Sequence, residues 1–234
     1  MMRNRNAWTL LTLALLLNAV PAGIPTASAT DIESGSLIYC PDGLERLLPG
    51  DYYACRARYH LQRNNPRQAV SMLEHASYWA NKDAQHSLGL AYSQGDLPGT
   101  PVDKPLGLAW LALAAERKSR AYMLDYTRAR AQCSEEEIAQ ANQLYLQLLP
   151  KYGDRVAGKR AMRRFNHEVA QIDVATNHGG TAYISGLTAI SQAALTLSKQ
   201  LHEKADDYFE GLQGSVTVGA LTPAAGLPAG EEHH

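Results

Sequence analysis

Histidine is the side chain best suited to acid–base chemistry near neutral pH and to metal binding. Six of the eight histidines lie scattered along the chain, at positions 60, 75, 86, 167, 178 and 202. His202 and Asp206 share a helix face at an i, i+4 spacing, in an acidic patch that also contains Glu203, Asp207 and Glu210. Two such ligands form at most a weak divalent-cation site. An exposed polar face is the simpler interpretation, so we predict that the chain holds no metal and no cofactor.

The sequence lacks the common signatures of catalysis. It contains no nucleophile elbow, no phosphate-binding glycine loop, no Cys-x-x-Cys pair and no His-x-x-x-His pair. Nothing positive indicates an enzyme, and we predict a non-enzymatic protein. A hydrolase whose site follows an unfamiliar pattern is kept as an alternative.

A basic stretch lies between residues 151 and 164, in a chain whose formal net charge is only −1. Its basic residues are Lys151, Arg155, Lys159, Arg160, Arg163 and Arg164. The functional interpretation is a face that binds anions or a membrane surface, such as phospholipid or lipopolysaccharide head groups. The simpler interpretation is the solvated side of a helix, because Asp154 and Glu168 lie nearby.

The three cysteines divide into a neighbouring pair and a distant single residue. Fourteen residues separate Cys40 from Cys55, and a disulfide that closes such a loop stabilises a fold by about 3 kcal/mol. We predict this bridge, with two buried free thiols as the alternative. Cys133 precedes Ser134 and Glu137, which have the spacing of a capping box. We therefore expect Cys133 to pack as an apolar residue and not to act as a nucleophile.

The first 29 residues have the composition of a secretory signal peptide. Arg3 and Arg5 precede an apolar run over 7–20, which prolines and a glycine then interrupt. The small residues 27–29 form a cleavage site, so we predict cleavage after Ala29 and an exported protein, periplasmic or secreted. A membrane anchor is the alternative, although the run is short for a span.

Charge and hydropathy restrict the partners of the exported chain. Cleavage removes two arginines, which lowers Lys and Arg from 22 to 20 against 23 Asp and Glu, a net charge of −3. Because binding to the phosphate backbone depends on many basic residues, we expect no nucleic-acid partner. No second apolar run is long enough for a stable membrane span.

Helical periodicity continues from residue 50 to residue 172, with proline and glycine interrupting it at short intervals. Asp51 and Asp83 open similar units 32 residues apart, and a period of this length is typical of a helical solenoid. Small residues such as Gly89 would allow the helices of a pair to approach closely. Gly95 would end its helix in the left-handed conformation. The segment 30–49 is expected to be irregular and tied to the first helix by the disulfide.

The motifs "LGLAYSQG" and "VDKPLGLAWLALAAE" occupy most of residues 83–118. This segment resembles a Sel1-like repeat, a relative of the tetratricopeptide repeat. The matching positions are Leu88, Gly89, Tyr92, Gly95, Val102, Asp103, Ala109, Trp110, Ala114, Ala115 and Glu116. The loop "DLPGTPVD" is about two residues longer than the family pattern, and Leu111 stands where the family often has Tyr.

The resemblance implies an adaptor in a protein assembly, because members of this family often serve that role in bacterial envelopes. We therefore predict a scaffold that binds another envelope protein through its helical surface. Tyrosine and tryptophan dominate interface energetics, which makes Tyr59, Tyr78, Trp79 and Tyr92 the candidate contact residues. Trp110 is expected to pack between helices instead. The alternative is a structural protein of the envelope surface that binds anionic lipid or glycan through residues 151–164.

The helical pattern breaks near residue 175 at a cluster of turn residues. Residues 181–185 and 214–221 have the pattern of strands, on either side of an amphipathic helix over 188–212. This predicts a small strand–helix–strand α/β unit at 173–222, followed by a disordered tail at 223–234. Its strands either pack within the chain or pair with a strand of a partner. The predicted fold is thus mostly α, a helix-pair solenoid at 50–172 with a small C-terminal α/β appendage.

Overall fold

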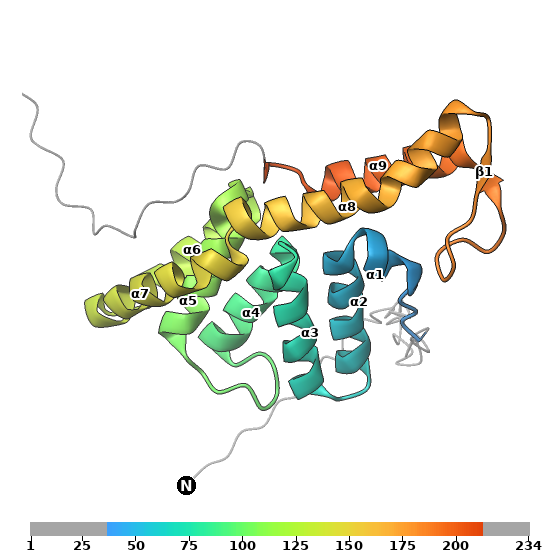
Figure 1. The fold of residues 1–234 in the computed structure, drawn as a ribbon. Coiled ribbons are helices and arrows are strands. Elements are labelled where there is room, and N and C mark those ends of the chain that lie inside the picture. The colour runs from blue at the N-terminus through green and yellow to red at the C-terminus, as the bar shows by residue number, and fades with distance from the viewer. Residues whose placement is uncertain (1–36, 213–234) are drawn as a thin grey trace, which may run out of the picture. The chain divides into compact units, whose positions relative to one another are not determined.

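The computed structural model describes residues 37–212, which are mostly helical and include one small two-stranded sheet (Figure 1). The predicted mostly α class is confirmed at this level. Within residues 37–212, no helix combines the length and the apolar character needed to cross a bilayer. The signal peptide expected at 1–29, the strand expected at 214–221 and the tail at 223–234 lie outside the described residues.

The described chain begins with a short helix, α1 (Gly43–Leu47), and a first helix pair, α2 (Pro49–Gln62) and α3 (Pro66–Tyr78). Prolines start α2 and α3, where the missing N–H would have had no partner in the helix. The helix α1 corrects the expectation of an irregular segment at 30–49. It forms because Leu44 and Leu47 are buried in a core with α8 and α9.

The predicted disulfide is confirmed. Cys40 is bonded to Cys55, which joins the residues before α1 to the middle of α2. Both cysteines are buried. Because a disulfide persists in an oxidising compartment, the bridge fits an exported protein.

The second helix pair is α4 (Lys82–Gln94) and α5 (Lys104–Ala114), followed by a 3₁₀ turn, η1 (Ala115–Arg117). The side chain of Asn81 accepts a hydrogen bond from the first turn of α4, and that of Asp103 does the same for α5. Gly95 ends α4 with a φ of 73°, as predicted. Both helices of the pair therefore carry a local start signal, and α4 also carries a stop signal.

The two helices of this pair approach closely at Gly89 and Gly107. A Cβ atom on Gly89 would lie 2.6 Å from the Leu111 side chain and 3.0 Å from its backbone nitrogen. A Cβ atom on Gly107 would lie 2.8 Å from the carbonyl oxygen of Gly89. The close approach predicted for Gly89 is therefore present. Other repeat positions pack in the interior, with Leu88, Trp110, Ala114 and Ala115 buried and Tyr92 half-buried.

The next helices are α6 (Arg120–Ala131) and α7 (Glu135–Tyr152), and both pack on α5. The predicted capping box is present, because Ser134 Oγ accepts from the Glu137 N–H and a Glu137 carboxylate oxygen accepts from the Ser134 N–H. Cys133 packs against the small core that contains Ile138, as expected for an apolar role. In contrast to α7, α6 has no buried residue.

The last part of the described chain contains the long helix α8 (Asp154–Asn177), the strands β1 (Thr181–Ala182) and β2 (Gln192–Ala193), and the helix α9 (Ala194–Tyr208). The strands pair antiparallel, and α9 packs on α8. Both strands precede the helix, so the described residues have the order strand–strand–helix, and the strand predicted after the helix lies outside them.

The expected helix at 188–212 thus begins six residues later, at Ala194. Ile190 fits the helical period with Ala194 and Leu197, yet it lies in the loop between the strands and is 75% exposed. Gly186 turns the chain here with a φ of 74°. The backbone N–H of Ala194 then bonds to the carbonyl of Gly180 next to the strand pair, which fixes the start of α9.

The helices form two main cores. The larger joins α2, α3, α4, α5 and α7, and the second joins α1, α8 and α9. The pairs α2–α3 and α4–α5 lie side by side, with α8 across their ends (Figure 1). This arrangement is compatible with a solenoid of helix pairs, and the solenoid type stays a prediction.

Candidate functional site

A buried cluster of four charged residues joins helices that are far apart in the sequence. Lys82 of α4 lies 2.7 Å from Glu116 of η1 and 3.2 Å from Asp154 of α8. Arg117 lies 2.9 Å from the other oxygen of Asp154. The side chains of Lys82, Glu116 and Asp154 are only 7%, 5% and 2% exposed. Because two positive and two negative charges balance, each buried charge has a partner. We call these four residues the ionic hub.

The hub also holds the C-terminal end of α9. The guanidinium of Arg117 donates to the carbonyl of Tyr208 at 2.6 Å and to the carbonyl of Ala80 at 3.0 Å. The Tyr208 hydroxyl in turn donates to the carbonyl of Trp79 at 2.5 Å, and burial raises the pKa of Tyr208 well above its ordinary value. The end of α9 is therefore fixed against the turn between α3 and α4.

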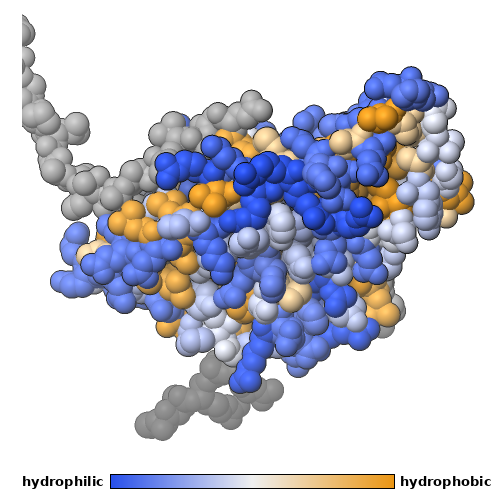
Figure 2. Space-filling view, viewed as in Figure 1, coloured by the Kyte–Doolittle hydropathy of each residue, from blue (hydrophilic) through white to orange (hydrophobic). Residues whose placement is uncertain are grey.

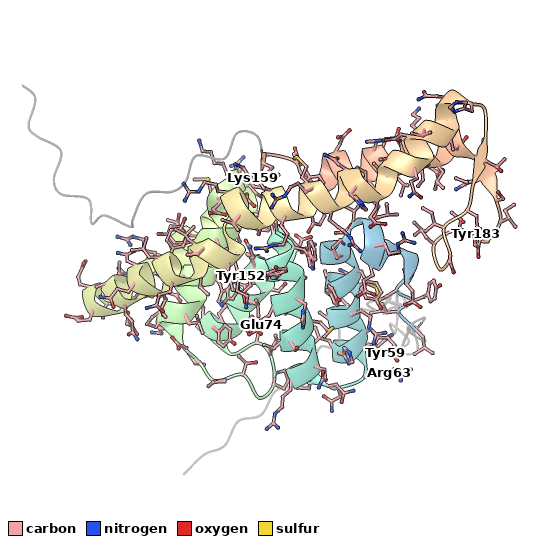
Figure 3. The ribbon with its side chains drawn as sticks, viewed as in Figure 1. Tyr59, Arg63, Glu74, Tyr152, Lys159 and Tyr183 are labelled. Carbon is pink, nitrogen blue, oxygen red and sulfur yellow. A yellow bond between two sulfur atoms is a disulfide. The ribbon has the colours of Figure 1, made fainter. Side chains whose placement is uncertain are left out.

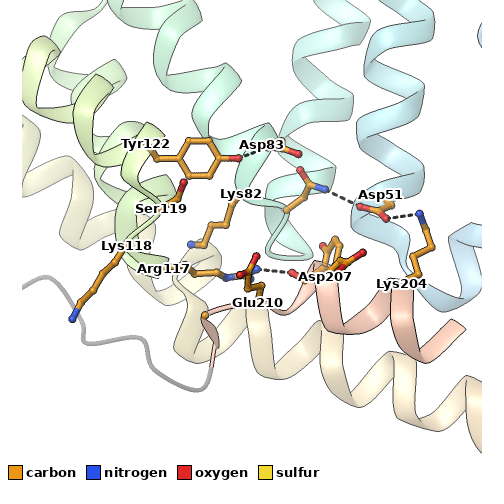
Figure 4. Close-up of a pocket in the computed structure, with 13 residues that line it drawn as sticks. Asp51, Lys82, Asp83, Arg117, Lys118, Ser119, Tyr122, Lys204, Asp207 and Glu210 are labelled. Atoms are coloured by element: carbon orange, nitrogen blue, oxygen red, sulfur yellow. Dashed lines mark hydrogen bonds and ion pairs between the residues drawn. The ribbon is translucent and has the colours of Figure 1, made fainter. Parts of the chain in front are cut away.

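A charged cavity of about 670 Å³ adjoins the hub and lies between α9, the start of α4 and the turn from η1 to α6 (Figure 4). Asp51 and Lys204 form an ion pair at 3.3 Å in its wall. The Tyr122 hydroxyl donates to the carboxylate of Asp83. Other charged groups that line it are Lys118, Asp207, Glu210 and, from the hub, Lys82 and Arg117.

A second cavity, of about 780 Å³, continues along α9 and has more apolar than polar surface, with Arg58 among the charged residues that line it. It lies between α9, α2 and the loop that joins β1 to β2. The residues that line both cavities are Asp51, Asn81, Asp83 and Lys204, so the cavities adjoin. Its apolar lining comes from Tyr39, Leu44, Ala54, Leu187, Ile190, Leu197 and Leu201. We call the two adjoining cavities the α9 groove, with a charged half and an apolar half.

Carboxylates crowd the charged half of the groove. Burial raises the pKa of Asp51 and the nearby Asp83 raises it further, whereas Lys204 lowers it, and the net shift is upward. Burial and the hydrogen bond to Asp83 both raise the pKa of Tyr122, which keeps its proton available for that bond. An additional positive charge in this half would therefore be favourable, because it would stabilise the ionised carboxylates.

The aromatic residues predicted to bind a partner do not form one surface. Tyr59 lies half-buried near the end of α2 that is remote from α8, where the Arg63 guanidinium covers its ring at 4.5 Å (Figure 3). Tyr92 is half-buried and packs against the larger core, and burial raises its pKa. Neither residue lines the α9 groove.

Tyr78 and Trp79 lie together at the C-terminal end of α3, with their rings edge to face at 5.4 Å. The Arg160 guanidinium covers the ring of Tyr78 at 3.6 Å. Both aromatic residues are half-buried, and their role as partner contacts stays a prediction. Trp110 is 4% exposed and contacts the ring of Tyr152, as expected for packing between helices.

The basic residues of 151–164 do not all face solvent. Arg160 donates to the carbonyl of Tyr78, and Arg164 donates to that of Arg46, so these two side chains fasten α8 to α3 and α1. Figure 2 shows a hydrophilic band along α8. The basic residues of the stretch that are exposed without such a backbone bond are Lys151, Arg155, Lys159 and Arg163.

A serine, an aspartate and a histidine meet between α8 and α9. Ser198 Oγ donates to Asp173 at 2.6 Å, and His202 Nε2 lies 3.1 Å from the same carboxylate. Activation of a serine requires the histidine between the nucleophile and the acid, whereas here the carboxylate is central. His202 thus contacts Asp173 and not Asp206, the partner considered from the sequence. Among residues 37–212, no three His, Cys, Asp or Glu side chains are grouped to hold a metal ion.

No family model, curated protein or solved structure matches this chain. The resemblance of residues 83–118 to a Sel1-like repeat therefore stays a prediction that rests on its own residues.

The sequence patterns predict neither the ionic hub nor the α9 groove. One signal was present, because Glu116 and Arg117 directly follow a strongly apolar helix, where a charged residue is buried only if it is paired. Their partners could not be read from the sequence, since Lys82 and Asp154 lie more than thirty residues away on other helices.

Proposed function

We propose that this chain is an exported, non-enzymatic scaffold that binds a segment of another cell-envelope protein in the α9 groove. The lining of the groove carries the proposal. The groove runs beside α9, from Gln192 before the helix to Gly211 after it, and combines an apolar half with a charged half. A polypeptide segment presents apolar and charged side chains along its length, as such a surface requires.

Fixed walls support this proposal. The ionic hub holds one end of the groove through the bond from Arg117 to the carbonyl of Tyr208. The disulfide between Cys40 and Cys55 holds the other end, where Tyr39 and Cys55 line the apolar half. A preformed site binds without the entropic cost of ordering its own walls, so it favours a partner that is itself flexible.

Cross-linking in cells that export the protein tests the proposal. A photoreactive side chain at Gln200, in the groove wall, is expected to give an adduct with one distinct protein, which mass spectrometry identifies. The control carries the same group at Leu146, which is 53% exposed on α7 and lies outside the groove. An adduct of equal yield from both positions, or none from Gln200, would contradict the proposal.

The hydrophilic band along α8 favours a second candidate, binding to anionic lipid or glycan at the envelope surface. The test is retention on vesicles that contain an anionic phospholipid. Changing Arg155, Lys159 and Arg163 to Glu is expected to abolish retention without unfolding the chain, because these side chains are exposed. Retention that is absent in the unaltered protein would remove this candidate.

A further inference from the structure

The charged half of the α9 groove has an excess of carboxylates once the hub is set aside. Lys82 and Arg117 line the groove, but their positive charges are balanced by the ion pairs that they form with Glu116 and Asp154 in the hub. The carboxylates that remain on the walls are Asp51, Asp83, Asp207 and Glu210, and the remaining cations are Lys118 and Lys204. Four negative charges therefore face two positive charges in this half, and Arg58 in the adjoining half adds a third positive charge.

Two of these carboxylates are available to a ligand. Asp51 is engaged by Lys204, and Asp83 accepts the hydrogen bond from Tyr122. Asp207 and Glu210, by contrast, are exposed and make no ion pair within the described part of the chain. The charge of the half thus complements a cationic side chain, which would lie between α9 and the start of α4.

The apolar half, at the other end of the same wall, offers exposed apolar surface at its rim, above a floor that is already packed in the second core. Leu197 and Leu201 of α9 form its floor, and Leu187 covers one side. At the rim, Tyr39 and Ile190 are 76% and 75% exposed. Apolar side chains that insert here would remove this rim from water, at about 25 cal/mol for each Å² buried.

The spacing of the two halves determines the length of the ligand. Leu197 and Asp207 are ten residues apart on α9, which corresponds to about 15 Å along the helix axis. An extended chain covers the same distance in about five residues. A segment of this length therefore reaches from the apolar floor to the free carboxylates.

We propose that the α9 groove binds an extended peptide segment of about five residues, with a lysine or arginine at one end and bulky apolar side chains at the other. The inference rests on the proposed function and specifies the chemistry of the partner segment. The basic side chain lies at Asp207 and Glu210, and the apolar side chains contact the exposed rim formed by Tyr39 and Ile190. Charge complementarity and the adjoining apolar cavity carry the assignment together.

Fluorescence anisotropy with blocked synthetic peptides tests this on the disulfide-bonded chain 30–234. The probes are Lys-Ala-Ala-Leu-Leu and its reverse, Leu-Leu-Ala-Ala-Lys, each carrying a fluorophore. We expect one of them to bind and its affinity to fall with salt. Replacing Lys by Glu, or both Leu by Ser, is expected to weaken binding about tenfold or more. Equal binding of the Glu peptides, or no binding of either probe, overturns the inference.

A matched pair of charge reversals locates the site. Asp207→Lys with Glu210→Lys is expected to weaken binding of the probe about tenfold or more. The control is Glu203→Lys with Asp206→Lys, which makes the same change on exposed positions of α9 outside the groove and should leave the affinity unchanged. Equal effects of the two pairs would overturn the inference.

The two proposals fail separately. If Gln200 cross-links a protein in cells but neither lysine probe binds, the chemistry assigned to the partner segment is wrong and the scaffold function stands. If Gln200 gives no adduct while a probe binds and the Asp207 and Glu210 reversals abolish that binding, the inference on the groove stands and the proposed partner class is wrong.

Discussion

At the scale of single residues, the ionic hub determines how the helices meet. A lysine as buried as Lys82 is tolerated only because Glu116 and Asp154 lie within 3.2 Å of its ammonium group. Arg117 balances the second negative charge and reaches the backbone of α9. The four side chains therefore act as one unit, and the loss of any one of them leaves a buried charge without its full set of partners.

Removing the charge of Lys82 tests this. Lys82→Met keeps the aliphatic stem but leaves an uncompensated carboxylate, so we expect a loss of about 3–5 kcal/mol in the free energy of unfolding, measured with urea. Adding Glu116→Gln neutralises that carboxylate and should recover part of the loss. If adding Glu116→Gln to Lys82→Met lowers the free energy of unfolding by as much as Glu116→Gln does in the unaltered chain, the two residues are not coupled.

Glu168 predicts a dependence of stability on pH. Its partial burial raises its pKa, but the hydrogen bond from Arg46 and the charge of Arg164 outweigh burial, so the pKa lies below the ordinary value of 4.5. A lowered pKa in the folded state means that the stabilisation is present above pH 4.5 and is lost as the pH falls through the folded pKa.

The measurement is urea unfolding at a series of pH values from neutral down to acid. In Glu168→Gln this acid-dependent part of the stability should disappear, while the stability at neutral pH should be lower than that of the unaltered chain. The same acid dependence in both proteins would show that Glu168 does not contribute to it.

At the scale of elements, the sequence predicts helix caps and the disulfide but not the residue at which strand structure gives way to a helix. Three predicted features depend on residues that are close in sequence. They are the capping box at Ser134, the end of α4 at Gly95 and the disulfide between Cys40 and Cys55. The start of α9 was misplaced because Ile190 continues the helical period, whereas the pairing of two short strands decides where the helix begins. β1 lies within the stretch 181–185 that is predicted as a strand, whereas the two residues of β2 carry no strand pattern of their own.

The close crossing of α4 and α5 predicts that Gly89→Ala destabilises the fold, although helix propensity alone would make the change stabilising. Gly89→Ala should stabilise an isolated helix by up to about 1 kcal/mol. Here the new methyl group meets the side chain and the backbone nitrogen of Leu111, so we expect a net loss of about 1–3 kcal/mol in the free energy of unfolding. Ser87→Ala, at an exposed position of α4, is the control and should change stability little. A stabilised Gly89→Ala variant would mean that the helices separate easily.

At the scale of the whole described structure, α9 lies beside helices that precede it by more than a hundred residues. The walls of the α9 groove come from the region before α1, from α2, from the starts of α4 and α6, and from the chain after β1. Periodicity and motifs indicate which faces are buried, but they do not indicate which distant faces meet. The fold class was therefore predictable from the sequence, whereas the groove required the structure.

The central claim is that a partner segment occupies the α9 groove. Amide hydrogen exchange, measured on the chain alone and in complex with the protein that Gln200 cross-links, tests it most directly. We predict new protection at residues 81–83, at 187–192 and along 197–211, with α7 unchanged. Protection confined to the basic side of α8 or to α7, with none along α9, would contradict the account.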